Sequence, residues 1–246
     1  MLKPFWNKVF KLNTGFGIVL ILLLGIPRIL IVLNANVTGN YQPVSIVFIC
    51  MWLAPFILLT KQGRTAIGLK KPVHYRWLLY AFLMGAGACL IMFLIAQWCY
   101  AHTLSNWFVY IAKSYQTSGI RLDGNNRLIY FIIYSVTSMT FSPIGEELFY
   151  RGIVHQSFAV QHGERKASLW DSLAFALTHL AHFGIVYIAD GWNFLFVPAV
   201  LWVSGMFLSS RIFFYCKVRS GSLAGAIIAH AGFNLMMIYL IFYHIL

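Results

Sequence analysis

The chain has 246 residues, of which 60% are hydrophobic and only 10% are charged. A soluble domain is about half apolar and a quarter charged, so this composition argues against a soluble enzyme, a disordered chain and a nucleic-acid-binding protein. Lys and Arg number 18 against 6 Asp and Glu. In so apolar a chain we interpret this positive excess as the bias of cytoplasmic membrane loops.

A helix that crosses a bilayer needs about 20 mostly apolar residues. Seven stretches qualify, approximately 15–33, 43–60, 77–98, 127–158, 168–188, 194–215 and 221–246. The first lacks a signal-peptide cleavage site, so we interpret it as a retained span. The fourth is too long for one simple crossing. It is expected to continue along the membrane surface or to bend at Ser142-Pro143, because proline breaks the helical hydrogen-bond ladder. The sequence predicts an all-α polytopic bundle, with residues 1–246 as one membrane domain.

Lys and Arg are divided unevenly between the loops. With the N-terminus inside, 13 fall in inner segments and three, Lys113, Arg121 and Arg127, in outer ones. Cytoplasmic loops carry such an excess, so we expect a cytoplasmic N-terminus and, after seven crossings, a C-terminus outside. Arg28, toward the outer end of the first span, is expected to snorkel to the interface. The loop over residues 102–126 is aromatic and is expected to lie in the outer interface.

Two of the six acids are adjacent and deep in a span, where ionisable residues are costly and mark function. They are Glu146 and Glu147, followed by Arg151. Glu147 and Arg151 are four apart and share a helix face, so we expect them to pair. Glu146 points about 100° away and faces other surroundings. The alternative is a buried ion-pair network that only holds helices together.

Two later spans carry further polar residues. His179 and His182 lie three apart, and His230 and Asn234 lie one turn apart on a shared face. A lone histidine on an apolar helix is more often a packing residue, and His230 with Asn234 could form an interhelical hydrogen bond. Yet Glu146, His179 and His230 each lie roughly 14–18 Å from the expected inner end of their span. We therefore expect these residues to meet at one level of the bundle.

This set of residues suits hydrolysis in an apolar cavity. An apolar surrounding makes a carboxylate a stronger base, which suits Glu146 as a general base. His179 can hold and polarise the water, while His230 and Asn234 can donate to the oxyanion that forms at a carbonyl. Glu147 with Arg151 would fix the helix. Other protease signatures are missing: the sequence has no HExxH or Gly-x-Ser-x-Gly motif.

Three ordered motifs resemble a known family. Glu146-Glu147-x-x-x-Arg151, Phe175-x-x-x-His179 and His230-x-x-x-Asn234 are similar to the motifs of the CAAX protease and bacteriocin-processing family of intramembrane proteases, also called CPBP or Abi. The flanks Glu-Leu-Phe-Tyr-Arg-Gly and Gly-Ser-Leu-Ala-Gly-Ala-Ile-Ile-Ala-His agree as well. The resemblance covers a core of about residues 127–240.

The resemblance implies a membrane endopeptidase similar to the Ras-converting CAAX protease. In that family the glutamate matching Glu146 activates water, the histidine matching His179 assists, and the residues matching His230 and Asn234 form the oxyanion hole. Implied reactions are CAAX-type C-terminal processing, or maturation or immunity processing of bacteriocin-like or signal peptides. We expect a peptide substrate that enters from the membrane or the cytoplasmic side, and no nucleic acid.

The family is often labelled metalloprotease, so whether the site binds a zinc ion stays open. Zinc normally takes three protein ligands and a water, and Glu146, His179 and His230 could supply them. We favour a metal-free glutamate mechanism with no cofactor. Two rival interpretations are a non-catalytic immunity or scaffold protein and a proton-coupled transporter, the latter predicting inverted repeats that the sequence does not show.

Overall fold

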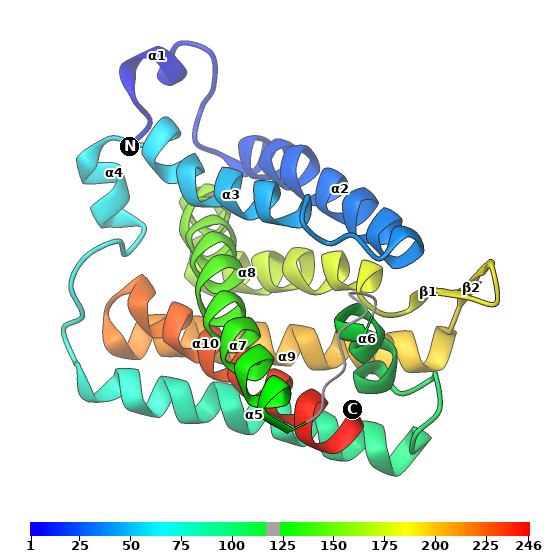
Figure 1. The fold of residues 1–246 in the computed structure, drawn as a ribbon. Helices are drawn as coiled ribbons and strands as arrows, with labels where there is room; N and C mark the ends of the chain where they lie inside the picture. The colour runs from blue at the N-terminus through cyan, green and yellow to red at the C-terminus, as the bar shows by residue number, and fades with distance from the viewer. Residues whose placement is uncertain (117–123) are drawn as a thin grey trace.

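The computed structural model describes residues 1–116 and 124–246, so Arg121 and Asp123 lie outside the described residues. Figure 1 shows a bundle of long helices. The long helices are α2 (Thr14–Thr38), α3 (Val44–Leu58), α5 (Arg76–Tyr100), α7 (Gly124–Glu146), α8 (His155–Thr178), α9 (Phe196–Ser220) and α10 (Leu223–Leu240). The short elements are α1 (Pro4–Asn7), α4 (Lys61–Ala66), α6 (Trp107–Gln116), the π-helices η1 (Glu147–Val154) and η3 (Ile241–Ile245), the 3-10 turn η2 (His179–Ala181), and strands β1 (Ile185–Ile188) and β2 (Gly191–Phe194).

The all-α polytopic architecture is confirmed, with a different division into spans. Among the described residues, five helical stretches are long and apolar enough to cross a membrane: α2, α5, α9, Leu223–Ile245 and a continuous Asn126–Ala181. Helix α3 is apolar but shorter, and Asn126–Ala181 joins the fourth and fifth expected spans into one stretch. The seven expected stretches thus reduce to five that are long enough to cross a membrane, because the fourth and fifth are fused and α3 is short.

The joined stretch changes direction at a glycine. Helix α7 continues through Pro143 to Glu146, and η1 follows directly. Gly163 interrupts α8 with φ 74° and ψ 163°, a left-handed conformation that glycine adopts without a Cβ clash. The interruption that separates the two halves therefore lies at Gly163, while the helix assignment runs unbroken through Ser142-Pro143.

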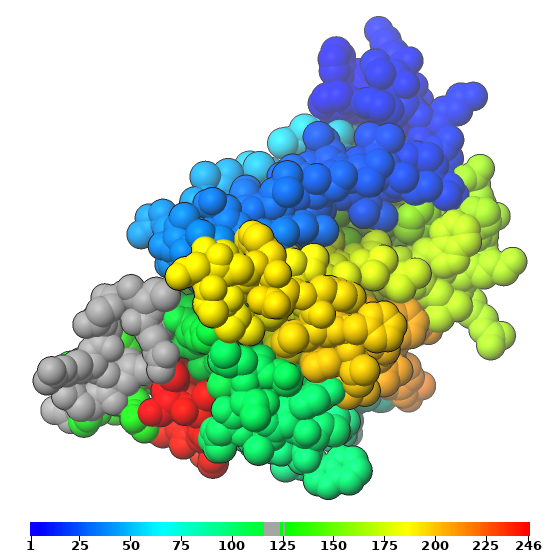
Figure 2. Space-filling view, turned by 90° about the vertical axis from the view of Figure 1, so that its right-hand side faces the viewer, coloured from blue at the N-terminus to red at the C-terminus, as the bar shows by residue number. Residues whose placement is uncertain are grey.

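A β-hairpin replaces the end of the fifth expected span. Residues expected to be helical up to Ile188 leave the helix at Ala181, and β1 pairs antiparallel with β2 in the register Ile185↔Phe194. Ala189 and Asp190 both have positive φ, 49° and 58°, as a two-residue hairpin turn requires. The β-branched run from Ile185 favours the strand. In Figure 2 the hairpin, in yellow, covers the space between the blue α2–α3 region and the green α5–α6 region.

The four basic segments expected inside gather at one end of the bundle. Lys3 N donates to Leu58 O, Thr14 N to Gln161 Oε1, and Val73 N to Ser220 O, each at 2.9 Å. The first two bonds join the N-terminal segment to the α3–α4 junction and to the α8 bend. The third joins the α4–α5 loop to the α9–α10 turn. We call this the basic end; Figure 1 shows the C-terminus away from it.

The aromatic residues of helix α6 are buried within the protein. Trp107 is 1% exposed, and Phe108 and Tyr110 are also buried. Trp107 contacts the rings of Phe183 and Trp202. These three side chains therefore pack inside the protein instead of facing outward, and residues 117–123 of the expected segment lie outside the described residues.

Helices α5 and α10 pack closely through glycine. A Cβ on Gly85 would lie 1.7 Å from the Ala229 carbonyl oxygen, and one on Gly232 would lie 2.3 Å from that of Phe82. The two backbones approach as small residues permit in membrane bundles. This contact fixes α10, which carries His230 and Asn234.

Candidate active site

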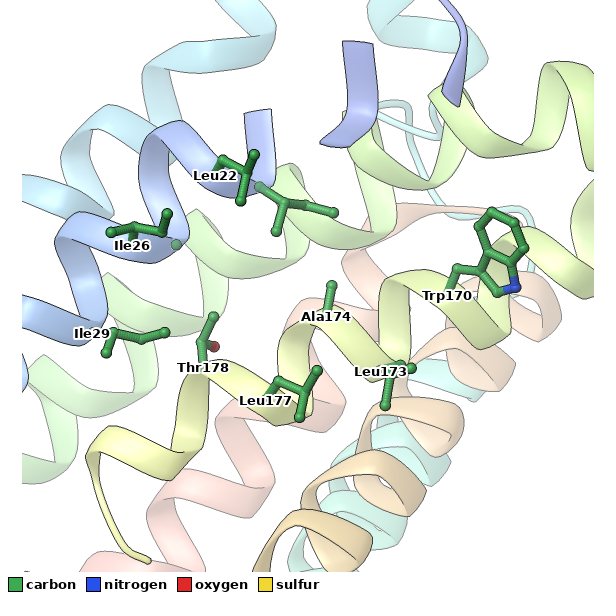
Figure 3. Close-up of a pocket in the computed structure, with 10 residues that line it drawn as sticks. Leu22, Ile26, Ile29, Trp170, Leu173, Ala174, Leu177 and Thr178 are labelled. Atoms are coloured by element: carbon green, nitrogen blue, oxygen red, sulfur yellow. The ribbon is translucent and has the colours of Figure 1, made fainter. Parts of the chain in front are cut away.

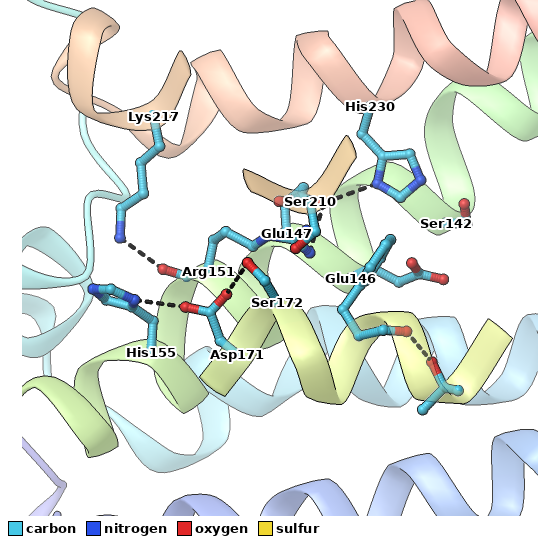
Figure 4. A network of polar contacts seen from close by, with 12 residues as sticks. Ser142, Glu146, Glu147, Arg151, His155, Asp171, Ser172, Ser210, Lys217 and His230 are labelled. Carbon is cyan, nitrogen blue, oxygen red and sulfur yellow. Dashed lines mark hydrogen bonds and ion pairs between the residues drawn. The ribbon is translucent and has the colours of Figure 1, made fainter. Parts of the chain in front are cut away.

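A cavity of about 540 Å³ inside the bundle brings the three sequence motifs together. Glu146 at the end of α7, His179 in η2, and His230 and Asn234 on α10 all line it. Glu147 and Arg151 do not line the cavity. They are fully buried in η1, and Figure 4 shows them beside His230. The structure therefore places all six predicted residues at one site, four on its wall and two behind it.

Glu147 connects the first motif to the third. Its Oε1 lies 3.1 Å from Arg151 Nη1, the pairing expected from their spacing, and 2.9 Å from His230 Nδ1. Arg151 also donates to Ser210 Oγ and stacks over the Phe175 ring, 4.2 Å from its centroid. Because Glu147 accepts from Nδ1, the ring of His230 is held in one orientation, with Nε2 as the nitrogen left for a ligand.

Glu146 has a partner that the sequence did not predict. Arg28 Nη2 on α2 lies 2.7 Å from Glu146 Oε1, and the two side chains are 2% and 1% exposed. Arg28 therefore does not snorkel to the interface. It stays inside because the ion pair and the surrounding polar groups satisfy a charge that would be costly alone.

His179 is fixed by the backbone and turns toward Arg28. Its Nδ1 lies 2.8 Å from the carbonyl oxygen of Phe175, which can only accept, so we assign the proton to Nδ1 and the lone pair to Nε2. That Nε2 lies 3.4 Å from Arg28 Nη2, as does Nε2 of His182. The His179 carbonyl accepts from Trp202 Nε1 at 2.9 Å. Both histidines of the second motif region therefore surround the guanidinium.

Asn234 is hydrogen-bonded to helix α7. Its Nδ2 donates to Ser138 O at 2.8 Å and to Ser142 Oγ at 3.2 Å. The side chain lines the cavity, but these bonds direct its amide hydrogens to α7. To act as an oxyanion donor, Asn234 must exchange one of these bonds for the ligand.

The residues do not form a metal site in this arrangement. Among the described residues, no three His, Cys, Asp or Glu side chains lie close enough together to hold a metal ion. In the expected set, Glu146 pairs with the Arg28 guanidinium, and Nε2 of His179 lies 3.4 Å from the same group. The cationic Arg28 lies where a cation would meet Glu146 and His179. We therefore derive no step through a metal.

A second polar cluster supports the site from the basic end. His155 Nδ1 lies 2.6 Å from Asp171 Oδ2, and its Nε2 lies 2.9 Å from Glu164 Oε2. Lys217 donates to the Arg151 carbonyl oxygen (Figure 4). This cluster ties the two halves of α8 together across Gly163. Asp171 is fully buried, and no spacing in the sequence pointed to His155 as its partner.

The cavity extends to the end of the bundle opposite the basic end. Its lining includes Asn40 and Gln42 in the α2–α3 loop and Thr137 and Phe141 on α7, all exposed, together with Ser45 on α3. It therefore reaches the surface beside the start of α3 and the middle of α7.

A separate hollow of about 420 Å³ lies between α2 and α8 (Figure 3). Its lining is apolar apart from Thr178, for example Leu22, Ile26 and Leu177. Thr178 Oγ1 accepts from Arg28 Nη1 at 2.8 Å. The Thr178 side chain thus lies between this hollow and the cavity, and the hollow itself offers no reactive group.

Residues 128–236 match the family model described as type II CAAX prenyl endopeptidase Rce1-like. The matched segment contains all six predicted site residues and omits α2 with Arg28. Neither a curated protein nor a solved structure matches the chain.

Proposed function

We propose that this chain, whose residues 128–236 match the Rce1-like family of type II CAAX prenyl endopeptidases, is an intramembrane endopeptidase with Glu146 as its base. The observation that carries the proposal is the convergence of Glu146, His179 and His230 from three separate elements on one cavity. A cavity that holds a carboxylate, an imidazole pair and an amide in an apolar bundle suits the attack of water on a peptide carbonyl.

The reaction proceeds in two steps. Glu146 takes a proton from a water held by Nε2 of His179, and the water oxygen bonds to the carbonyl carbon. The oxyanion forms beside His230, which donates to it from Nε2 as an imidazolium whose other N–H is held by Glu147. Asn234 donates as well once its amide turns from α7. Glu146 then gives the proton to the amine nitrogen, and the C–N bond breaks. Glu147 and Arg151 hold His230 in place throughout.

In this proposal the chain is a multi-pass membrane protein with its N-terminus in the cytoplasm. This orientation rests on the excess of Lys and Arg at the basic end. The substrate is a peptide that enters the cavity from the membrane between α3 and α7, either for CAAX-type C-terminal processing or for maturation or immunity processing of a bacteriocin-like or signal peptide.

The test is cleavage of a peptide library by the purified protein in detergent. We expect Glu146→Gln to abolish cleavage, because amide nitrogen cannot take the proton, and His230→Ala to lower kcat by about 100- to 1,000-fold, the cost of one oxyanion donor. Glu146→Asp keeps a carboxylate but withdraws it by one methylene, so it should also lower kcat, and it is the test to use if the glutamine variant fails to fold. Asp190→Asn, at the exposed hairpin turn, is the matched control and should cleave normally.

Two results would overturn the mechanism. Equal cleavage by wild type and a folded Glu146→Gln variant would remove Glu146 as the base. Loss of cleavage on chelation, restored by zinc, would replace the metal-free mechanism, since we expect chelator to have no effect.

A further inference from the structure

Arg28 belongs to the site although it lies outside the family match. It is on α2, a hundred residues before the matched segment begins. Its guanidinium forms part of the cavity wall, and only 2% of the side chain is exposed. A buried arginine in a membrane helix is expensive, so it is a functional hypothesis by default.

The guanidinium contacts the first and the second motif at once. Nη2 lies 2.7 Å from Glu146 Oε1 and 3.4 Å from Nε2 of both His179 and His182. Nη1 donates to Thr178 Oγ1, directly before His179 in the chain. One planar group therefore sets the separation of the carboxylate and the imidazole that the proposed reaction uses.

The charges of the site divide into two pairs. Glu147 is balanced by Arg151 within η1, and it also accepts from His230. Among the described residues, the ion pair of Glu146 is with Arg28. Since Arg151 is committed to Glu147 and Ser210, it is Arg28 that balances the carboxylate on the cavity wall.

We propose that Arg28 is the positioning residue of this site, which holds Glu146 as an ionised carboxylate and orients it beside His179. The proposal rests on the proposed function for its catalytic consequence. An isolated carboxylate buried in an apolar medium takes up a proton instead of staying charged, and a protonated Glu146 cannot accept a proton from water. The planar guanidinium bonds Thr178 through Nη1 while Nη2 faces Oε1 of Glu146, an arrangement that a lysine ammonium would not reproduce.

The first measurement is kinetic. Arg28→Gln should lower kcat by about 10- to 100-fold with KM little changed, as expected for a group that orients a reacting side chain. Arg28→Lys keeps the charge without the planar guanidinium, so it should lose less. Arg64→Gln is the control, because Arg64 likewise donates to an oxygen and lies over a phenylalanine ring, but at the basic end.

The second measurement does not depend on cleavage. Infrared difference spectra at neutral pH should show a protonated carboxyl stretch in Arg28→Gln. That band should be missing from wild type and from the double variant Arg28→Gln/Glu146→Gln, which assigns it to Glu146. A merely structural arginine would change the unfolding temperature without creating this band.

The outcomes separate this inference from the proposed function. If wild type cleaves peptides and a folded Arg28→Gln variant cleaves as fast without the band, the role of Arg28 is overturned and the protease stands. If wild type cleaves nothing but the band appears in Arg28→Gln, the protease fails and the pairing stands. If Arg28→Gln does not fold, the Arg28→Lys variant decides. A kcat of Arg28→Lys equal to that of wild type would show that the planar guanidinium is not required, and would overturn the proposal.

Discussion

The two adjacent glutamates are balanced by arginines at very different distances along the chain. Arg151 is one helical turn from Glu147, so the i, i+4 rule predicted that pair directly. Arg28 is on another helix, and no periodicity in the sequence says which helix faces Glu146. Snorkelling was the reasonable expectation for a lone arginine near a span end, and it failed because the structure supplies a buried partner.

Removing one member of the Arg28–Glu146 pair should cost more stability than removing both. Glu146→Gln leaves the Arg28 guanidinium buried without its partner, and Arg28→Gln forces Glu146 to take up a proton, each at a cost of about 3 kcal/mol, whereas the double variant leaves two neutral amides. A double-mutant cycle on unfolding in detergent measures this coupling. Additive losses would show that the two charges do not interact.

The hydrogen bonds of the polar residues were predicted less well than their positions. Matching depths in three spans correctly placed Glu146, His179 and His230 on one cavity. The bond from His230 to Glu147 and the bonds from Asn234 to α7 depend on side-chain directions and on the irregular helix η1, which spacing alone does not determine. The catalytic roles of these residues stay predictions.

At the scale of elements, the long apolar helices were predictable and their interruptions were not. Hydropathy finds α2, α5, α9 and α10, because each must satisfy its backbone within the membrane. The π-helix η1 has no composition signal, although such segments often occur at functional sites. The hairpin was hidden because Ile185–Ile188 is as apolar as the helix before it.

The packing of α5 on α10 gives a prediction with an internal control. Gly85→Ala should destabilise the protein by about 1–3 kcal/mol, since its Cβ would overlap the Ala229 carbonyl and force the helices apart. Gly87→Ala, two residues along the same helix, has no atom within 4 Å of the added Cβ. It should be neutral or slightly stabilising, because alanine is the better helix former.

Thermal unfolding of both variants in the same detergent is the measurement. Equal unfolding temperatures for Gly85→Ala and Gly87→Ala would contradict the close approach of α5 and α10. Cleavage should fall with Gly85→Ala as well, because α10 carries His230.

At the scale of the whole molecule, the basic end and the mouth of the cavity lie at opposite ends. The charge count predicted that the inner segments belong together, and the bonds between them confirm that they share one end. Which end faces the cytoplasm stays a prediction from the positive-inside rule. If the rule holds here, the substrate enters from the outer half of the bilayer, the lateral one of the two routes expected from the sequence.

Cysteine labelling tests this orientation. In a variant with the exposed Cys50 and Cys99 replaced by serine, Asn40→Cys lies at the cavity mouth and Gln62→Cys at the basic end. A membrane-impermeant maleimide should label only Asn40→Cys in intact cells and both after lysis. Labelling of Gln62→Cys alone in intact cells would reverse the orientation and place the mouth in the cytoplasm.

The position of Arg28 has a consequence for how the protein is made. Helix α2 is synthesised first, while Thr178, which binds Arg28, follows 150 residues later. Until α7 and α8 are synthesised, the Arg28 guanidinium on α2 has no partner. Placing an unpaired arginine at the centre of a bilayer costs about 2.5–3.5 kcal/mol. We therefore expect α2 to insert less readily alone than together with the later helices that supply the partners of Arg28. The charge of Arg28, which pairs with Glu146 in the site, thus also makes assembly of the site depend on the order in which the helices are synthesised.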